Sequence, residues 1–133
     1  MDEKYNYLGI DWGAANIGVA LAHQETGVAL PYTTIKNDTD VFSRLGEIIV
    51  LEDIATVVIG IPEYPYRVRE LSDAEMFGRV LGERFGVTVA HQNEMFTTKM
   101  AESNLIEQGI KGASKQNDEE AARIILQEWL SRR

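Results

Sequence analysis

Hydrophobic residues dominate three short strand-like segments near the start of the chain. Segments 5–11, 16–23 and 28–35 are rich in apolar and β-branched side chains, as strands are. The link Trp12–Ala15 between the first two segments suits a tight hairpin. Pro31 in the third segment predicts an edge strand or a bulge, because proline cannot donate a ladder hydrogen bond. We therefore expect an antiparallel meander.

Helical spacing and two further strands follow the meander. Apolar residues recur at helical spacing over 39–52, and Asp38 or Asp40 could cap that helix. Segment 55–61 is almost uniformly apolar, which is typical of a central strand covered on both faces. Segment 87–90 predicts a short fifth strand.

Start and stop signals delimit the remaining helices. Ser72–Glu75 has the pattern of a capping box, and it opens a helix that Gly86 ends. A helix is expected over 98–108. Asn117 followed by Glu120 forms another cap pair, which predicts the start of the last helix.

The order β-β-β-α-β-α-β-α-α predicts an α/β fold. Three antiparallel strands followed by parallel strands give a mixed five-stranded sheet, flanked by helices on both faces. Neither a linker nor an internal repeat interrupts the pattern, so we expect one domain over residues 1–133.

Composition narrows the chemistry. The chain has no cysteine, which excludes disulfides, thiolate zinc sites and a cysteine nucleophile. It shows no signal-like N-terminus and no apolar run of bilayer length, so a cytoplasmic protein without a membrane partner is expected. The net charge of −8 argues against tight, non-specific binding to long DNA, because phosphate affinity comes largely from Lys and Arg. A local basic patch, a structured RNA partner or bound metal remains compatible with that charge.

Asp11 is the first candidate functional residue. It ends an apolar strand, where a carboxylate costs free energy unless it is paired or bound to metal. Strand alternation points its side chain away from the face of Ile10. A cap for the following turn explains Asp11 equally well at this point.

Two further acids occupy positions that could converge on the first strand. Glu94 follows the fifth strand, and open α/β sheets place their sites at the carboxyl ends of strands. Asp118 begins the predicted last helix, where an acid gains roughly 0.3–1 kcal/mol from the helix dipole. Taken singly, an exposed loop acid and a dipole-stabilised acid explain them.

Together, Asp11, Glu94 and Asp118 predict a catalytic metal site. Three converging carboxylates repel one another without a cation, and hard oxygen ligands suit Mg²⁺ or Mn²⁺. Two such ions about 3.5–4 Å apart can activate water for phosphodiester hydrolysis. Other chemistries lack support, since the sequence has neither a nucleophile elbow nor a Walker or Rossmann motif. His91 is interpreted as a structural histidine or as a supporting group near Glu94.

Four motifs resemble the YqgF family in order and spacing. They are the opening hairpin Gly9–Gly13 with Ile17–Leu21, the apolar strand Val57–Pro62, the segment Asn93–Thr98 and the closing helix Asp118–Ala122. The similarity covers about residues 7–130. Any single motif would be weak, whereas four in order are specific.

The resemblance implies an RNase H-like fold and a nuclease of Mg²⁺ or Mn²⁺ type. It implies either a Holliday junction resolvase acting on branched DNA or the nuclease that matures the 5′ end of precursor 16S rRNA. The acidic chain favours structured RNA over branched DNA. Ribosomal precursor particles are further expected partners, and a monomer or weak homodimer is the expected assembly. By the match, Asp11, Glu94 and Asp118 are the metal-binding carboxylates.

Departures from the family pattern concern its basic residues. Ala15, Asn16 and Met95 stand where the family has polar or basic side chains. A catalytically impaired RNA- or ribosome-binding module of the same fold is therefore an alternative. A nucleotide-binding relative of the actin and sugar-kinase fold is another, although the chain is too short for a second lobe. The remaining candidates for nucleic-acid contact are Arg67, Arg69, Lys99, Lys111 and Lys115.

Overall fold

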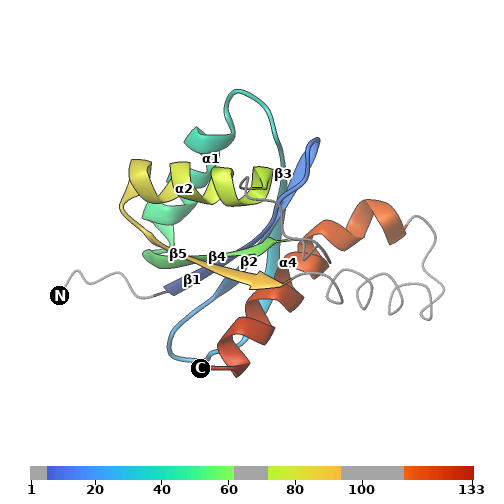
Figure 1. The fold of residues 1–133 in the computed structure, drawn as a ribbon. Coiled ribbons are helices and arrows are strands. Elements are labelled where there is room, and N and C mark those ends of the chain that lie inside the picture. The colour runs from blue at the N-terminus through green and yellow to red at the C-terminus, as the bar shows by residue number, and fades with distance from the viewer. Residues whose placement is uncertain (1–5, 62–71, 94–112) are drawn as a thin grey trace.

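The computed structural model describes residues 6–61, 72–93 and 113–133, with side chains in the last segment described from 118 onward. Five strands and three helices lie in these ranges (Figure 1). In chain order they are β1 (Asn6–Asp11), β2 (Asn16–Ala22), β3 (Ala29–Lys36), α1 (Val41–Leu51), β4 (Ile54–Ile61), α2 (Asp73–Phe85), β5 (Thr88–Asn93) and α4 (Ala113–Ser131). The predicted helix over 98–108 lies outside the described residues.

The strands form one mixed sheet in the order β3-β2-β1-β4-β5. β1 pairs antiparallel with β2, which pairs antiparallel with β3, whereas β1–β4 and β4–β5 are parallel. α1 and α2 lie against one face of the sheet and α4 lies against the other (Figure 1). The predicted architecture is therefore confirmed, and β1 occupies the centre of the sheet.

The position of Pro31 in β3 agrees with its chemistry. β3 is an edge strand, and Pro31 pairs with Ala20 directly beside a register shift between Val19 and Ala20. The sequence predicted an edge strand or a bulge, because proline removes one donor from the ladder, and the structure shows both an edge and an irregularity.

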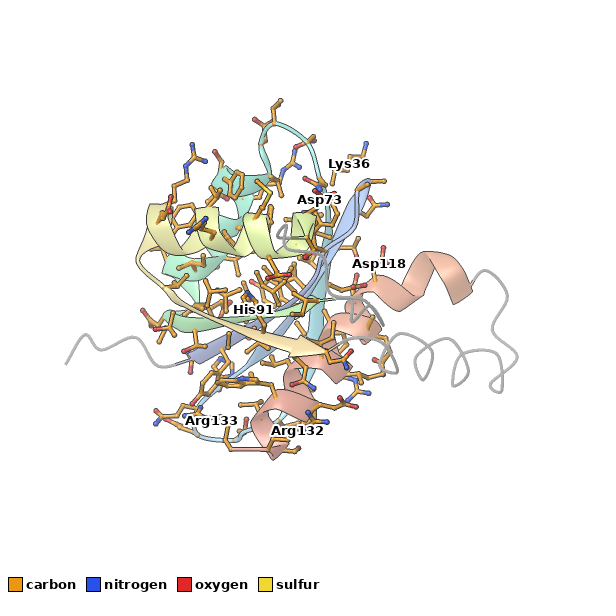
Figure 2. The ribbon with its side chains drawn as sticks, viewed as in Figure 1. Lys36, Asp73, His91, Asp118, Arg132 and Arg133 are labelled. Atoms are coloured by element: carbon orange, nitrogen blue, oxygen red, sulfur yellow. The ribbon has the colours of Figure 1, made fainter. Side chains whose placement is uncertain are left out.

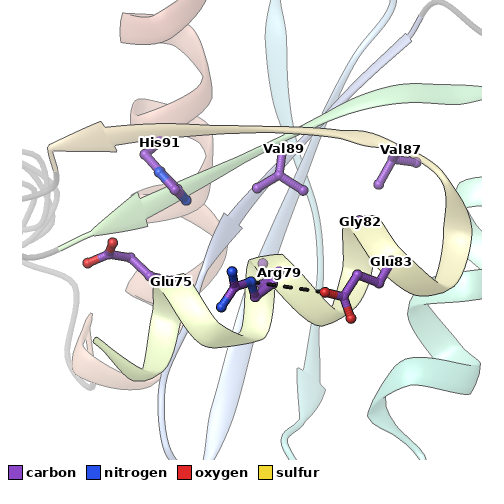
Figure 3. A pocket seen from close by; sticks show the side chains of 8 residues that line it. Glu75, Arg79, Gly82, Glu83, Val87, Val89 and His91 are labelled. Atoms are coloured by element: carbon purple, nitrogen blue, oxygen red, sulfur yellow. Dashed lines mark ion pairs between the residues drawn. The ribbon is translucent and has the colours of Figure 1, made fainter. Parts of the chain in front are cut away.

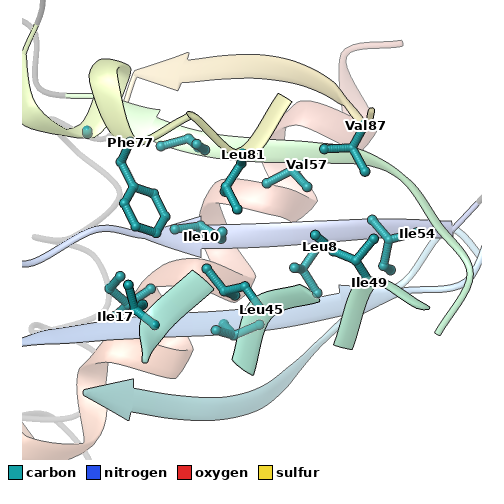
Figure 4. Packing of buried hydrophobic residues seen from close by; sticks show 14 of the residues in the cluster. Leu8, Ile10, Ile17, Leu45, Ile49, Ile54, Val57, Phe77, Leu81 and Val87 are labelled. Atoms are coloured by element: carbon teal, nitrogen blue, oxygen red, sulfur yellow. The ribbon is translucent and has the colours of Figure 1, made fainter. Parts of the chain in front are cut away.

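The main core lies between the sheet and the α1–α2 layer (Figure 4). Leu8 and Ile10 of β1 are fully buried there, together with Leu45 of α1 and Leu81 of α2. Burying each such side chain contributes roughly 1.5–3 kcal/mol. β4 is covered on both faces, as predicted.

Small residues set the approach of α4 to the other face. Ala20 and Ala22 of β2 pack there with Ala122 and Leu126 of α4. A Cβ atom added to Gly9 would lie 2.7 Å from Leu126 Cβ and 2.8 Å from the Ala122 carbonyl oxygen. The helix therefore lies too close to β1 for any side chain at position 9.

The predicted boundaries of α2 are confirmed. The Ser72 hydroxyl accepts a hydrogen bond from the Glu75 N–H at 3.2 Å, and the Ser72 N–H donates to the Glu75 carboxylate at 3.4 Å. Gly86 ends the helix with φ of 69°, a left-handed conformation that favours glycine.

Ser72→Ala is expected to destabilise the protein by about 1 kcal/mol, because the Glu75 N–H loses its acceptor at the start of α2. Urea unfolding followed by circular dichroism measures this difference. Ser72→Asp keeps an acceptor and should unfold near the wild-type midpoint, and equal losses in the two variants would contradict the capping role.

One predicted cap is wrong, and the other is confirmed in its position only. α4 begins at Ala113, so Asn117 lies inside the helix and does not cap it. No glycine or proline separates residue 113 from residue 117, so nothing in the backbone prevents the helix from starting earlier. At α1, Asp40 holds the N-cap position without a side-chain cap bond, and the Asp38 carboxylate accepts from the Asp40 N–H at 3.0 Å instead.

In the part of the chain that the structure describes, no helix has the length and apolar character needed to cross a membrane.

Candidate functional site

Asp11 is the last residue of β1, the central strand, and it is partly buried. Ile10 belongs to the core under α1 and α2, whereas Gly9 lies against α4. Because successive side chains alternate between faces, the Asp11 side chain belongs to the α4 face. The faces of Gly9 and Ile10 agree with the predicted separation of Asp11 from the face of Ile10.

Gly18 is the cross-strand partner of Asp11 and also packs against α4. It pairs with Asp11 across the hairpin, so their Cα atoms are roughly 4.5–5.5 Å apart. A Cβ atom at Gly18 would overlap the carbonyl carbon and oxygen of Asp118 and would lie 3.0 Å from the Glu119 nitrogen. The α4 backbone at Asp118 therefore rests directly on the residue opposite Asp11, so the backbones of two of the three predicted ligand residues lie close together.

Glu119 fixes the rotation of α4 at this point. Its carboxylate accepts a hydrogen bond from the Thr34 hydroxyl at 3.2 Å, and Thr34 is the β3 partner of Gly18. Thr34, Gly18 and Asp11 thus form one row across three strands beneath the helix. Sequence reasoning assigned no role to Thr34 or Glu119, and their contact depends on a register that spacing alone does not reveal.

The structure gives less support to the interpretation of Asp118 as an acid that is stabilised by the helix dipole. Because α4 begins at Ala113, Asp118 lies beyond the first turn of the helix, which is where the dipole acts most strongly. Burial raises the pKa of the Asp118 carboxyl, and the neighbouring Glu119 carboxylate raises it further. A cation bound at this carboxylate would offset both effects.

In the metal-free protein, Asp118→Asn is expected to remove one pH dependence of stability. The folded pKa of Asp118 lies above 3.8, so between 3.8 and the raised value the folded state holds more protons than the unfolded state. Stability therefore falls as pH rises through that window. Urea unfolding in EDTA across this range should show the fall in wild type and less of it in Asp118→Asn. Identical pH profiles would contradict the assignment.

Asn37 holds the turn that follows Asp11. Its side-chain amide donates to the Gly13 carbonyl at 2.8 Å, and its backbone N–H donates to the Ala15 carbonyl at 3.0 Å. The end of β3 is therefore tied to the β1–β2 hairpin. Sequence reasoning missed this residue, although an asparagine at the end of a strand is a known turn signal.

The third predicted ligand, Glu94, lies outside the described residues. Two positions earlier, Gln92 is buried and donates to the Glu128 carboxylate of α4 at 3.2 Å, so it belongs to the α4 face. β5 runs parallel to β4 and β1, so it ends at the same edge of the sheet as Asp11. The structure thus describes the strand that leads to Glu94.

His91 lies on the face opposite to Asp11. Figure 3 shows its side chain directed toward α2, across a groove of about 450 Å³ from Glu75. Arg79 lines the same groove and pairs with Glu83 at 4.0 Å. His91 is exposed.

The chemistry of the donors fits a hard divalent cation. Asp11 and Asp118 offer carboxylate oxygens, the ligands that Mg²⁺ and Mn²⁺ prefer. Within residues 6–61, 72–93 and 118–133, no three His, Asp or Glu side chains gather into a metal-binding group. The predicted set needs a third carboxylate, and Glu94 is outside those ranges.

The predicted nucleic-acid contacts remain predictions. Arg67, Arg69, Lys99 and Lys111 lie outside the described residues, and Lys115 has a described backbone in α4 but no described side chain.

Comparison with known proteins decides the family. The family model RuvX, described as Holliday junction resolvase, matches residues 5–132. The chain belongs to the RuvX (YqgF) family. The resemblance inferred from the four motifs is therefore confirmed.

Curated relatives of this RuvX-family chain match it over most of their length. A protein of Mycobacteroides abscessus is 35% identical over 138 residues, covering 95% of this chain and 81% of its own. A protein of Lactococcus lactis is 35% identical over 132 residues, covering 92% of each chain. Both carry the name "Putative pre-16S rRNA nuclease".

Solved structures confirm the RNase H-like fold. Thermus thermophilus RuvC in complex with a Holliday junction substrate has a TM-score of 0.58 at 17% identity, covering 96% of this chain and 94% of its own. A Fowlpox virus resolvase in complex with Holliday junction DNA has a TM-score of 0.50 at 7% identity, covering 96% and 98%.

Proposed function

We propose that this chain is a divalent-metal-dependent endonuclease that hydrolyses phosphodiester bonds during 5′-end maturation of precursor 16S rRNA. The observation that carries the proposal is the contact of the Asp118 backbone with Gly18, the cross-strand partner of Asp11. It supports the proposal because it brings the backbone of Asp118 close to Asp11 at the carboxyl end of the central strand, where open α/β sheets bind their ligands.

Asp11, Asp118 and Glu94 would hold the metal. Mg²⁺ or Mn²⁺ supplies positive charge that stabilises the phosphate in the transition state and eases deprotonation of the attacking water. β1 presents Asp11 from the rigid centre of the sheet, and the Thr34–Glu119 bond keeps α4 in the rotation that presents Asp118. These residues therefore fix the donor positions before substrate arrives.

RNA is favoured over four-way DNA by two observations. The curated relatives are named for precursor 16S rRNA, and the net charge of −8 disfavours clamping of a long duplex. The family description and the RuvC complex keep a Holliday junction as the alternative substrate. One domain over residues 1–133, a cytoplasmic location, ribosomal precursor particles as partners and a monomer or weak homodimer remain our predictions.

The test is cleavage of a 5′-extended 16S rRNA fragment by the wild-type protein. We expect cleavage with Mn²⁺ or Mg²⁺, loss of cleavage in EDTA and recovery when metal is added back. A four-way DNA junction assayed in parallel tests the alternative. Cleavage that persists in EDTA would contradict the metal role, and a folded protein that binds the RNA without cleaving it would show a binding module instead.

A further inference from the structure

Lys36 is the last residue of β3. It lies at the end of the sheet where β1 also ends at Asp11, and on the same face as Asp11. Ile35 packs against the core under α1, whereas Thr34 bonds to Glu119 of α4. Alternation therefore assigns Lys36 to the α4 face. β3 and β1 both run antiparallel to β2, so their carboxyl ends share one edge of the sheet.

The backbone that carries Lys36 is held against the hairpin after Asp11. Lys36 pairs with Asn16, the first residue of β2. Asn37 follows, and its two hydrogen bonds to Gly13 and Ala15 tie this strand end to the turn. The backbone of Lys36 is thus held in a fixed position relative to the candidate metal site. Its side chain is exposed to solvent (Figure 2).

The Lys36 ammonium is available for an anion. Among the side chains that the structure describes, it forms no ion pair within 4.0 Å, whereas Arg44 and Arg123 each pair with a carboxylate. The hydrogen bond from the Asp40 N–H, more than the charges of Arg44 and Lys36, lowers the pKa of the Asp38 carboxyl. That carboxylate already accepts from the Arg44 guanidinium at 3.2 Å and from a backbone N–H.

We propose that Lys36 binds a phosphate of the RNA backbone beside the phosphate that is cleaved. Strand spacing and rise put its Cα about 12 Å from the Asp11 Cα, which favours a neighbouring phosphate over the one at the metal site. Lysine acts in such contacts as a flexible point charge. The inference rests on the proposed function. Lys36 pairs with Asn16, and the turn Ala14–Asn16 has no basic side chain of its own.

Binding and cleavage by Lys36→Met test the proposal. Binding is measured by fluorescence anisotropy of a labelled 5′-extended 16S rRNA fragment with Mn²⁺, in an Asp11→Asn background that prevents cleavage. We expect about tenfold weaker binding for Lys36→Met and a salt dependence shallower by about 0.7 in log–log slope, because one phosphate contact is lost. In the active background KM should rise similarly, with kcat within about twofold of wild type. Lys36→Arg should restore most of the affinity.

Arg79→Met is the matched control, because Arg79 lies on the α2 side of the sheet and pairs with Glu83. Unchanged affinity and salt slope in Lys36→Met, beside a wild type that binds and cleaves the RNA, would overturn the role of Lys36 alone. A folded wild type that neither binds nor cleaves the RNA would overturn the proposed function and this contact with it. A loss equal to that of Arg79→Met would show a general charge effect and would also contradict the assignment.

Discussion

Asp11→Asn is expected to lower the rate of RNA cleavage at least about 1000-fold while leaving the protein folded. The amide keeps the size of the side chain but lacks the negative charge that a hard divalent cation requires. Metal charge stabilises the transition state by several kcal/mol, and each 1.36 kcal/mol is tenfold in rate. Single-turnover cleavage of the 5′-extended 16S rRNA fragment with Mn²⁺ measures the loss.

Asp53→Asn provides the matched control for this substitution. Asp53 is exposed, precedes β4 and therefore lies at the opposite edge of the sheet from Asp11. Its φ of 53° is left-handed, a conformation that asparagine tolerates well. The control should keep wild-type activity. Cleavage by Asp11→Asn at the rate of the control would remove Asp11 from the mechanism.

Gly18→Ala is expected to damage both stability and activity. The added methyl group would overlap the Asp118 backbone, so α4 must move away from the sheet or β2 must distort. Overpacking of this kind typically costs about 1–3 kcal/mol of unfolding free energy. A shift of about 1 Å in a catalytic group can cost about 100-fold in rate, and either movement would displace Asp118 relative to Asp11. Urea unfolding and single-turnover cleavage measure the two losses.

Gly82→Ala separates this steric effect from the general cost of changing a glycine. A Cβ atom at Gly82 would meet its nearest neighbour, Val89 Cγ2, at 3.3 Å, which a small adjustment can accommodate. Alanine also has the higher helix propensity, by about 1 kcal/mol. The control should therefore retain activity. Wild-type stability and cleavage in Gly18→Ala would show that α4 does not rest on β2 as described.

The sheet and the α2 boundaries followed from the sequence because their signals are local. A short apolar segment predicted β1, and the Ser72–Glu75 pair predicted the start of α2. The start of α4 was placed too late. Asn117 has the pattern of a helix cap, but the residues just before it are also compatible with a helix. Local propensity alone cannot decide at which of these residues the helix begins.

The candidate site was predicted in part. Asp11 was visible as an acid in an apolar strand, but its relation to Asp118 depends on Gly18, a contact between segments about a hundred residues apart. The positions of Thr34 and Lys36 near the candidate site follow from the register between β2 and β3. That register cannot be read from the sequence until the strand pairing is known. Residues of this kind carry no local signal that singles them out.

The most direct test of the metal site is a crystal structure of the protein soaked in Mn²⁺, with anomalous scattering used to locate the ion. The account predicts an anomalous peak about 2.0–2.3 Å from carboxylate oxygens of Asp11, Asp118 and Glu94 at the carboxyl end of β1. A Mn²⁺ peak that contacts neither Asp11 nor Asp118, at a concentration that supports cleavage, would contradict it.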